Sequence, residues 1–379
     1  MPRVDHGAGG ARVSTQAIAE RVRDAAARGT RLPIAGARTW FDPGPDALSV
    51  AAERGIVEYT PGDLTLTARA GTTLAELARA TGAERQWLTL DPHGTDAGTI
   101  GATVATASWG PLAHAFGTPR DLVLGLEAVT GDGAIIRTGG RVVKNVAGFD
   151  LTRLFTGSWG SLAVITEVTV RLRARPEVDE TIAIAVRDDA PDALGALLAK
   201  VRAASAAPLA LELLSPAIAA RLGAGASTVL LARLGGNAES VRAQRAALAA
   251  VSSVTTVGDD VWRAIRGIEA AESAVIRLSA RPSRLAELWR TVREATSHWS
   301  GAYAHATVGR GVVRLVAQDP GPGVTDIITV TVAGGGMPIV ERLGSLPGFG
   351  VDPGGAPPEL WRRIRSAFDP HGILSSEAA

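Results

Sequence analysis

The chain has 379 residues, of which 46% are hydrophobic and 20% charged, so its composition is that of a folded globular protein and excludes a disordered one. A formal net charge of +1 with scattered arginines removes any electrostatic case for nucleic-acid binding. The absence of cysteine excludes disulfides, cysteine-ligated iron–sulfur clusters and a cysteinyl-linked flavin. We expect no signal peptide and no membrane insertion, and therefore a cytoplasmic location, with membrane association arising only through partners.

The first quarter of the chain is predicted from helix periodicity, caps and turn residues. A helix is expected over residues 14–28, with Ser14 as its N-cap, and short strands are expected at 32–34, 55–59 and 64–68. Thr73 is placed to cap a helix over 74–81, which stops at Gly82. This part is therefore expected to mix helices and strands.

Residues 91–167 consist mainly of glycine, other small residues and short β-branched runs. A backbone of this kind can approach a large flat ligand and its phosphates closely. A hairpin of strands 122–130 and 134–137 and a long strand at 162–172 are expected here. The pair Lys144-Asn145 is notable because the chain has only two lysines and two asparagines, and lysine differs from arginine in shape and pKa range.

The second half has a different order of elements. Arg175-Pro176 is the predicted domain boundary. The strands that follow, at 181–186, 209–214, 228–234 and 254–257, alternate with helices at 191–203 and 238–250 in the order β-α-β-β-α-β, which is ferredoxin-like. A similar series begins with strand 274–279, helix 282–297 and strands 302–307, 311–317 and 327–332, and the sequence leaves open whether it is a complete unit. A helix at 358–368 closes the chain.

Several segments resemble, in order and spacing, the FAD-binding domain of the vanillyl-alcohol oxidase and p-cresol methylhydroxylase superfamily. They are residues 70–74, 98–101, 120–121, 139–151 and 157–167, with 368–374 resembling the closing motif. The whole chain looks most like the smaller FAD-binding subunit of bacterial glycolate oxidase. The resemblance implies an α+β fold with a two-part FAD-binding domain at 1–176, a small ferredoxin-like cap domain at 177–340 and a C-terminal segment, 341–379, that returns to the FAD domain.

The resemblance implies FAD as the cofactor, and backbone N–H groups in glycine-rich turns can bind its pyrophosphate without a bulky cation. The first loop departs from the family's consecutive glycines, because Ala37 and Arg38 would resist positive φ angles, although Arg38 could compensate with charge-assisted hydrogen bonds. Family members that bind the flavin covalently often use a histidine in this loop. The loop has no histidine here, so we predict non-covalent FAD. The candidate cofactor-binding residues are Gly36, Thr39, Pro92, Gly98, Thr99, Ile100, Gly101, Thr106, Ser108, Arg120, Asp121, Lys144, Asn145, Gly148, Asp150 and Ile165.

Oxidation of a 2-hydroxy acid needs a cation for the carboxylate and a base for the hydroxyl proton beside the flavin. Lys144 is the candidate catalytic cation, and Arg120 is an alternative unless it forms an internal pair with the adjacent aspartate. His93 or His114 could be the base, so none is assigned. The paired cap histidines of larger relatives are missing, and the single His305 does not make a metal site, so no metal is expected.

Three hypotheses follow for function. The first is an FAD-containing subunit of a glycolate oxidase-like complex that acts on a small 2-hydroxy acid such as glycolate or lactate, beside a larger flavoprotein subunit and an iron–sulfur subunit. The second is a stand-alone FAD oxidase or dehydrogenase of a small hydroxy acid or alcohol. The third is a non-catalytic assembly subunit with a degenerate flavin site, which the altered first loop suggests.

Overall fold

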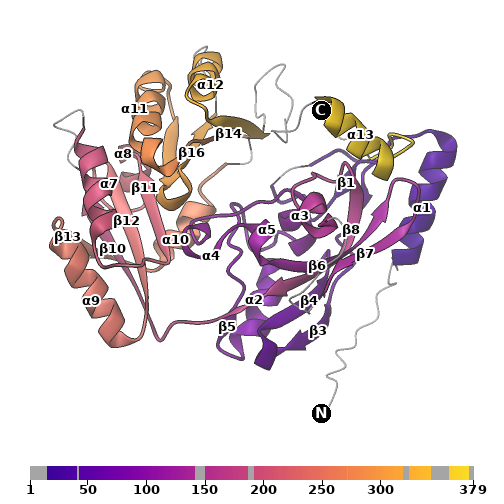
Figure 1. The fold of residues 1–379 in the computed structure, drawn as a ribbon, viewed down its shortest axis with the longest axis horizontal. Helices are drawn as coiled ribbons and strands as arrows, with labels where there is room; N and C mark the ends of the chain where they lie inside the picture. Colours follow the sequence, from indigo (N-terminus) through magenta and orange to yellow (C-terminus); the bar gives the residue numbers. More distant parts are fainter. Residues whose placement is uncertain are drawn as a thin grey trace.

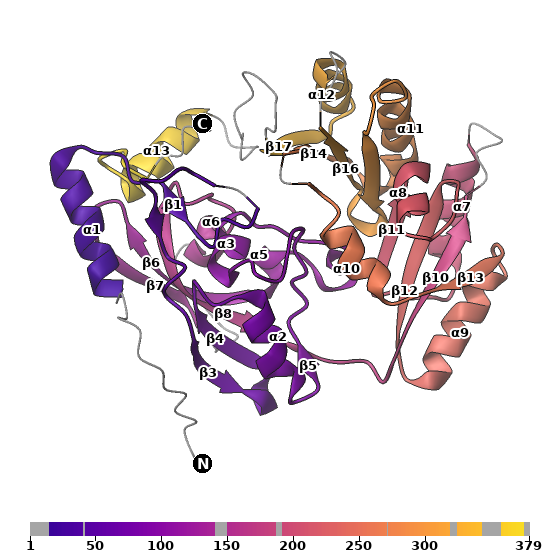
Figure 2. The same cartoon turned by 180° about the vertical axis from the view of Figure 1, so that it is seen from behind.

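The computed structural model describes residues 15–40, 42–140, 150–186, 192–270, 272–318, 324–342 and 358–374. They form two α+β units that lie side by side, one on a five-stranded and one on an eight-stranded sheet (Figures 1 and 2). One hydrophobic cluster fills the first unit and includes Ile373 and Leu374 from the tail, and two further clusters belong to the second. This arrangement supports a division near Pro176, and the boundaries 1–176, 177–340 and 341–379 remain our proposal.

The first unit contains an antiparallel sheet in the order β3-β4-β8-β6-β7. Its strands are β3 (Ile56–Thr60), β4 (Thr65–Arg69), β6 (Val123–Thr130), β7 (Ile135–Gly139) and β8 (Ala163–Arg171). Two small sheets accompany it, the parallel pair β1 (Ile34–Ala35) and β2 (Leu48–Ser49) and the antiparallel pair β5 (Gln86–Trp87) and β9 (Arg173–Ala174). The strands expected from the sequence are present, with ends shifted by a few residues.

Short helices surround this sheet. They are α1 (Thr15–Arg28), α2 (Leu74–Gly82), α3 (Ile100–Ala105), α4 (Ala113–Phe116), α5 (Pro119–Leu122), α6 (Leu151–Phe155) and the returning α13 (Pro358–Phe368). The predicted cap of α2 is confirmed, because the Thr73 side chain accepts from the N–H of Glu76, whose carboxylate accepts from the N–H of Thr73 at 2.8 Å. Helix α13 lies near α1 in both views (Figures 1 and 2). Its Phe368 ring meets that of Phe155 edge-on.

The second unit is an eight-stranded antiparallel sheet made of two ferredoxin-like halves. The first half contains β10 (Val178–Ala185), α7 (Ala193–Ala203), β11 (Ala210–Leu214), α8 (Pro216–Arg221), β12 (Val229–Gly236), α9 (Ala238–Ala249), β13 (Val254–Val257) and α10 (Asp260–Arg266). The second half contains β14 (Ala274–Ser279), α11 (Leu285–Ala295), β15 (Tyr303–Thr307), β16 (Val312–Ala317), α12 (Val324–Ala333) and β17 (Met337–Arg342). Strands β11 and β15 pair where the two halves meet, which we call the seam. The second half has every element of the β-α-β-β-α-β order, so the second series is a complete unit.

One prediction in this region is wrong. Residues 327–332 were expected to be a strand, but they lie in helix α12, and the last strand is β17. The β-branched residues of this segment favour a strand. However, Val324, Ile327 and Thr331 are buried and recur at helical spacing, so packing of this single face against the cap core outweighs local propensity.

The two faces of the cap sheet differ in what covers them. Helices α7, α9, α11 and α12 contribute to the larger cap core, whereas α8 and α10 pack on the opposite face of the first half. That opposite face is turned toward the first unit, and α10 lies between the units beside α4 (Figures 1 and 2). Across the described ranges, no helix combines the length and apolarity that crossing a membrane requires.

Candidate functional site

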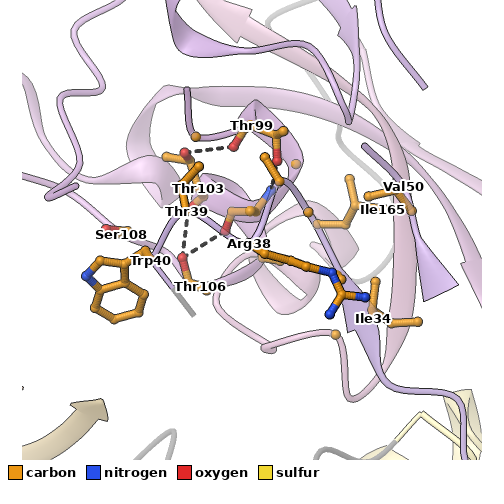
Figure 3. A pocket seen from close by; sticks show the side chains of 18 of the residues that line it. Ile34, Arg38, Thr39, Trp40, Val50, Thr99, Thr103, Thr106, Ser108 and Ile165 are labelled. Carbon is orange, nitrogen blue, oxygen red and sulfur yellow. Dashed lines mark hydrogen bonds between the residues drawn. The ribbon is translucent and has the colours of Figure 1, made fainter. Parts of the chain in front are cut away.

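A pocket in the first unit encloses about 1240 Å³ of space, counting the part open to solvent. It lies among the loop after β1, the segment around α3 and the start of β8 (Figure 3). Nine of the residues proposed from the sequence as cofactor ligands line it: Gly36, Thr39, Pro92, Gly98, Thr99, Gly101, Thr106, Ser108 and Ile165. These residues come from distant parts of the chain, and the fold gathers them around one space.

The first loop keeps a tight turn despite its altered sequence. Arg38 adopts φ +57°, so the expectation that it would resist a positive φ is wrong. A left-handed conformation costs a non-glycine residue about 1–2 kcal/mol. The Arg38 guanidinium bonds the carboxylate of Asp42 and lies 2.5 Å from the carbonyl oxygen of Gly44, and these contacts help to hold the turn.

Close packing places this loop against α3. A Cβ atom on Gly36 would lie 2.7 Å from Oγ1 of Thr99, so only glycine fits there without movement. Thr99 is also the N-cap of α3, where its hydroxyl accepts from the N–H of Ala102 at 3.4 Å. Within the helix, the hydroxyl of Thr103 donates to the carbonyl oxygen of Thr99 at 3.0 Å (Figure 3). The floor of the pocket is thus built from small residues and hydroxyl groups.

The lining fits FAD. Ile34, Val50 and Ile165 give one part of the pocket an apolar wall suited to a flat ring. The pocket-lining residues that the structure describes include no carboxylate, and Arg38 is their one guanidinium, so a dianionic pyrophosphate meets no repulsive side chain there. Backbone N–H groups of the small residues supply further donors without bulk.

Other proposed cofactor residues have different surroundings. Ile100 is fully buried in the core of the first unit. Arg120 donates through Nε to the carbonyl oxygen of Thr156 at 3.2 Å. Asp121 and Asp150 accept backbone N–H bonds at the starts of α5 and α6. None of these four lines the pocket, and in the described part of the chain Arg120 and Asp121 bond other partners rather than each other. Lys144, Asn145 and Gly148 lie outside the described residues, so their proposed roles remain predictions.

The pocket ends at the cap, where Trp40 and His93 line it. The His93 side chain is 1% exposed, and neither ring nitrogen has a hydrogen-bond partner among the described residues. Burial, followed by the nearby charge of Arg314, holds the pKa of His93 well below its ordinary value, so the ring is neutral at pH 7. Its Nδ1 lies 3.9 Å from Oε1 of Glu269, and its ring centroid lies 5.1 Å from that of His305.

A buried polar cluster on the cap sheet faces this end of the pocket. The Arg314 guanidinium donates from Nε to Glu269 at 2.9 Å and from Nη1 to Glu341 at 2.5 Å. Burial is the largest influence on Glu341 and opposes its charge, but Arg314, Arg277 and Arg342 together outweigh it and hold the pKa of this carboxyl below its usual range. Arg277 contacts Glu341 at 3.0 Å, and its guanidinium carbon lies 6.0 Å from the centre of the Trp109 ring.

The sequence contains a pattern that indicates part of this cluster. Three adjacent cap strands each place one charged residue or histidine within a largely apolar run: Glu212 of β11, His305 of β15 and Arg314 of β16. Because side chains alternate between the faces of a strand, and these three strands are neighbours, the polar residues reach one face together. Glu269 joins them from the loop after α10, where it pairs with Arg314, and His93 joins them only through the contact between the two units. Strand periodicity reveals neither contact.

Comparison with known proteins identifies the first unit. Residues 13–139 match the family model described as FAD binding domain. The N-terminal unit is an FAD-binding domain. Its cofactor is therefore FAD, as the sequence predicts, and the pocket described above is its candidate binding site.

The curated relatives are named as enzymes of hydroxy acids. The chain is 40% identical over 167 residues to the glycolate oxidase subunit GlcE of Escherichia coli K12, which covers 43% of this chain and 48% of that protein. It is 33% identical over 243 residues to the glycolate oxidase subunit GlcD of Bacillus subtilis 168, covering 62% of this chain and 50% of that protein. The chain thus spans about half the length of these curated relatives.

The fold extends over nearly the whole chain. A crystal structure of p-cresol methylhydroxylase with substrate bound matches 96% of this chain and 86% of its own, with a TM-score of 0.71 at 16% sequence identity. At this identity the likeness concerns the fold alone. It confirms the predicted α+β architecture of the p-cresol methylhydroxylase type.

Proposed function

We propose that this chain is an FAD-dependent oxidoreductase that oxidises a small 2-hydroxy acid, such as glycolate or lactate. FAD, when bound, accepts the hydride from the carbon that carries the hydroxyl group. The FAD-binding domain and the names of the curated relatives support this class of reaction. Whether the chain acts as a dehydrogenase or as an oxidase depends on its electron acceptor.

The observation that carries the proposal is the contact of two pocket-lining residues, Trp40 and His93, with the polar face of the cap. Trp40 lines the pocket, and its ring lies 5.5 Å from the guanidinium carbon of Arg342, while its Nε1 lies 3.4 Å from Oε2 of Glu269. A substrate at this end would lie between the FAD domain and buried guanidinium groups. Such groups are suited to a carboxylate, because planar N–H donors bind it in a defined orientation.

We assign the carboxylate of the substrate to Arg277. Its Nε has no hydrogen-bond partner in the described part of the chain, and its side chain is 18% exposed, whereas that of Arg314 is 5% exposed and bonds two carboxylates. Arg277 thus has donor capacity left for a ligand. Lys144 remains the alternative cation, on the sequence argument alone.

We further propose that the chain works as a subunit, beside a larger flavoprotein subunit and an iron–sulfur subunit. The relatives named as glycolate oxidase subunits support this reading. Among the described residues, strand β17 is the last strand of its sheet and carries the exposed Met337, and the preceding helix α12 carries the exposed Val330 and Val332. An unpaired edge with apolar side chains is suited to a partner chain. Any membrane association would come through these partners.

The proposal is tested by the visible spectrum of the FAD-loaded chain during anaerobic addition of glycolate or D-lactate. Bleaching by the chain alone supports a stand-alone dehydrogenase, and bleaching only after addition of the partner subunits supports the complex. Flavin that stays oxidised in both cases contradicts the proposed reaction. A chain that takes up no FAD supports the assembly subunit instead.

Two matched variants separate the candidate cations. Arg277→Gln should slow flavin reduction by about 10²-fold or more, the loss expected when a positioned charge is removed, while Arg263→Gln on the exposed side of α10 should not. Lys144→Ala should weaken flavin reduction more than folding, compared with Lys200→Ala at the exposed second lysine. Unchanged kinetics with unchanged FAD content would remove the residue concerned from the mechanism.

A further inference from the structure

Three buried side chains from different parts of the chain meet at the end of the pocket. They are His93 from the loop after β5, Glu269 after α10 and His305 on β15. One potential ligand atom from each lies within 4.8 Å of the other two. The side chains are 1%, 1% and 0% exposed, so bulk water does not screen them.

The ring of His305 is oriented for a ligand. Its Nδ1 lies 2.6 Å from Oε1 of Glu212, whose other oxygen accepts from the hydroxyl of Thr307 at 2.9 Å. This carboxylate fixes the ring and places the proton on Nδ1, which leaves a lone pair on Nε2. That Nε2 atom is buried and has no hydrogen-bond partner among the described residues. A carboxylate behind a histidine in this way is typical of histidines that bind metal ions.

His93 provides the second free nitrogen, and it does so from the other unit. Both of its ring nitrogens are buried without a partner in the described ranges. Three buried imidazole nitrogens therefore lack a partner within one small volume. Leaving such atoms unsatisfied is unfavourable. A neutral imidazole has one N–H and one lone pair, so a bound species that accepts one lone pair from each ring would stabilise the arrangement.

Glu269 has capacity for a further ligand. Its Oε1 accepts from Nε of Arg314 at 2.9 Å and lies 2.8 Å from Nη2 of the same residue. Within the described ranges, its Oε2 has only the long contact of 3.4 Å from Trp40. A carboxylate offers about four lone-pair positions, so these contacts do not saturate it. Arg314 also bonds Glu341, so its charge is shared between two carboxylates. The nearby guanidinium should make a cation site of moderate rather than extreme affinity.

We propose that His93, Glu269 and His305 together bind one divalent transition-metal ion of the Zn²⁺ class, at the contact between the FAD domain and the cap. Two imidazoles and one carboxylate are a donor set that such ions prefer, and the set leaves a coordination position open. Because ligand atoms lie about 2.0–2.2 Å from zinc, binding would draw the three side chains together by roughly 1 Å. The expectation of no metal rested on a single histidine, and His93 supplies the second.

The test is Zn²⁺ binding by untagged, FAD-loaded protein that has first been stripped with a chelator. Competition with a chromophoric chelator should give one ion per chain. His93→Asn and His305→Asn should each weaken binding by about 10-fold or more, and Glu212→Gln, which removes the orienting charge, by about 10–100-fold. His298→Asn is the matched control, because this histidine is exposed on the cap and should leave affinity unchanged.

X-ray absorption on the Zn²⁺-loaded wild type gives a second readout that does not depend on variants folding. Scattering from two imidazoles supports the site. Wild-type protein that binds no ion, or an ion whose affinity survives both histidine substitutions, overturns it. Far-UV circular dichroism and flavin content identify a variant that is merely unfolded. Because neither measurement uses a hydroxy acid, the metal site and the proposed reaction can fail independently.

Discussion

His305 and Glu212 form a fully buried pair, with Nδ1 and Oε1 2.6 Å apart and neither side chain exposed to solvent. They lie on β15 and β11, the two strands that join the halves of the cap, where His305 is directly opposite Leu214. Removing one partner of this buried pair would lower the stability of the fold, because each group is the hydrogen-bond partner of the other where water cannot replace it. The pair therefore links the stability of the cap to the orientation of the His305 ring.

Glu212→Ala should lower the free energy of unfolding by about 3–5 kcal/mol, because it leaves two buried donors, on His305 and Thr307, without their acceptor. Glu212→Gln keeps the shape and one acceptor oxygen, so we expect a smaller loss of about 1–3 kcal/mol. Urea unfolding followed by circular dichroism measures both values. Glu294→Ala, at an exposed position of α11, is the control. A loss in the alanine variant with none in the glutamine variant would show that the cost comes from packing alone.

Gly36→Ala should weaken FAD binding. The added Cβ would lie 2.7 Å from Oγ1 of Thr99 and 3.0 Å from Cβ of Ala102, so either the loop or the start of α3 must move. Gly62→Ala introduces the same methyl group where no atom lies within 4 Å, and it should leave binding unchanged. Fluorescence titration of the stripped protein with FAD compares them. Equal affinity in the two variants would mean that the loop does not contact the cofactor.

Much of the fold could be predicted from the sequence, because local rules and global packing agree in most elements. Helix α2 begins at its threonine cap, and the hairpin of β6 and β7 turns at Gly131 and Gly133 as expected. Helix α12 shows where local rules fail. Its β-branched residues favour a strand, and only the packing of a single buried face in the cap core decides for a helix.

The candidate site also has one part that the sequence predicts and one part that it does not. Its glycine and hydroxyl part lies in short contiguous motifs, so nine proposed residues line one pocket. The polar end depends on the contact of residue 93 with residues 269 and 305, and no rule of periodicity relates positions so far apart. The conformation of Arg38 was also unpredictable, since its side-chain contacts compensate for a backbone angle that its type disfavours.

Arg38→Gly and Arg38→Ala should differ in stability although both lose the same guanidinium. Glycine adopts φ +57° freely, whereas alanine keeps the steric cost, so the glycine variant should be more stable by about 1–2 kcal/mol. The bonds to Asp42 and Gly44 are lost in both. Thermal unfolding measures the difference. Identical stability would indicate that the loop relaxes to another conformation once the arginine is removed.

His114 should make stability depend on pH. Burial, followed by the charge of Arg310, lowers its pKa to about 4, and its Nδ1 accepts from the N–H of Gly309 in the cap at 3.2 Å. Between pH 6.5 and about 4 the unfolded chain binds a proton at this residue and the folded chain does not, so stability falls as the pH falls, by up to about 1.4 kcal/mol per unit. Above pH 6.5 the contribution is constant.

The measurement is urea unfolding of the wild type and His114→Gln at pH 7 and pH 5. The difference in unfolding free energy between the two proteins should change in favour of the variant at the lower pH. A difference that is the same at both values would show that His114 titrates alike in the folded and unfolded chains.

Asp369→Ala should lower both stability and FAD affinity, because this carboxylate fixes the tail against the pocket. Its two oxygens accept from the N–H groups of Ile373 at 3.0 Å and Leu374 at 2.9 Å, and Leu374 lines the pocket. Loss of two hydrogen bonds to a charged group should cost about 3–6 kcal/mol of unfolding free energy. His371 lies in the same turn but is exposed, so His371→Ala should change neither quantity. FAD titration and urea unfolding of both variants measure the two effects. An equal loss of stability and FAD affinity in His371→Ala would show that the histidine fixes the turn and that the aspartate acts only at the end of the helix.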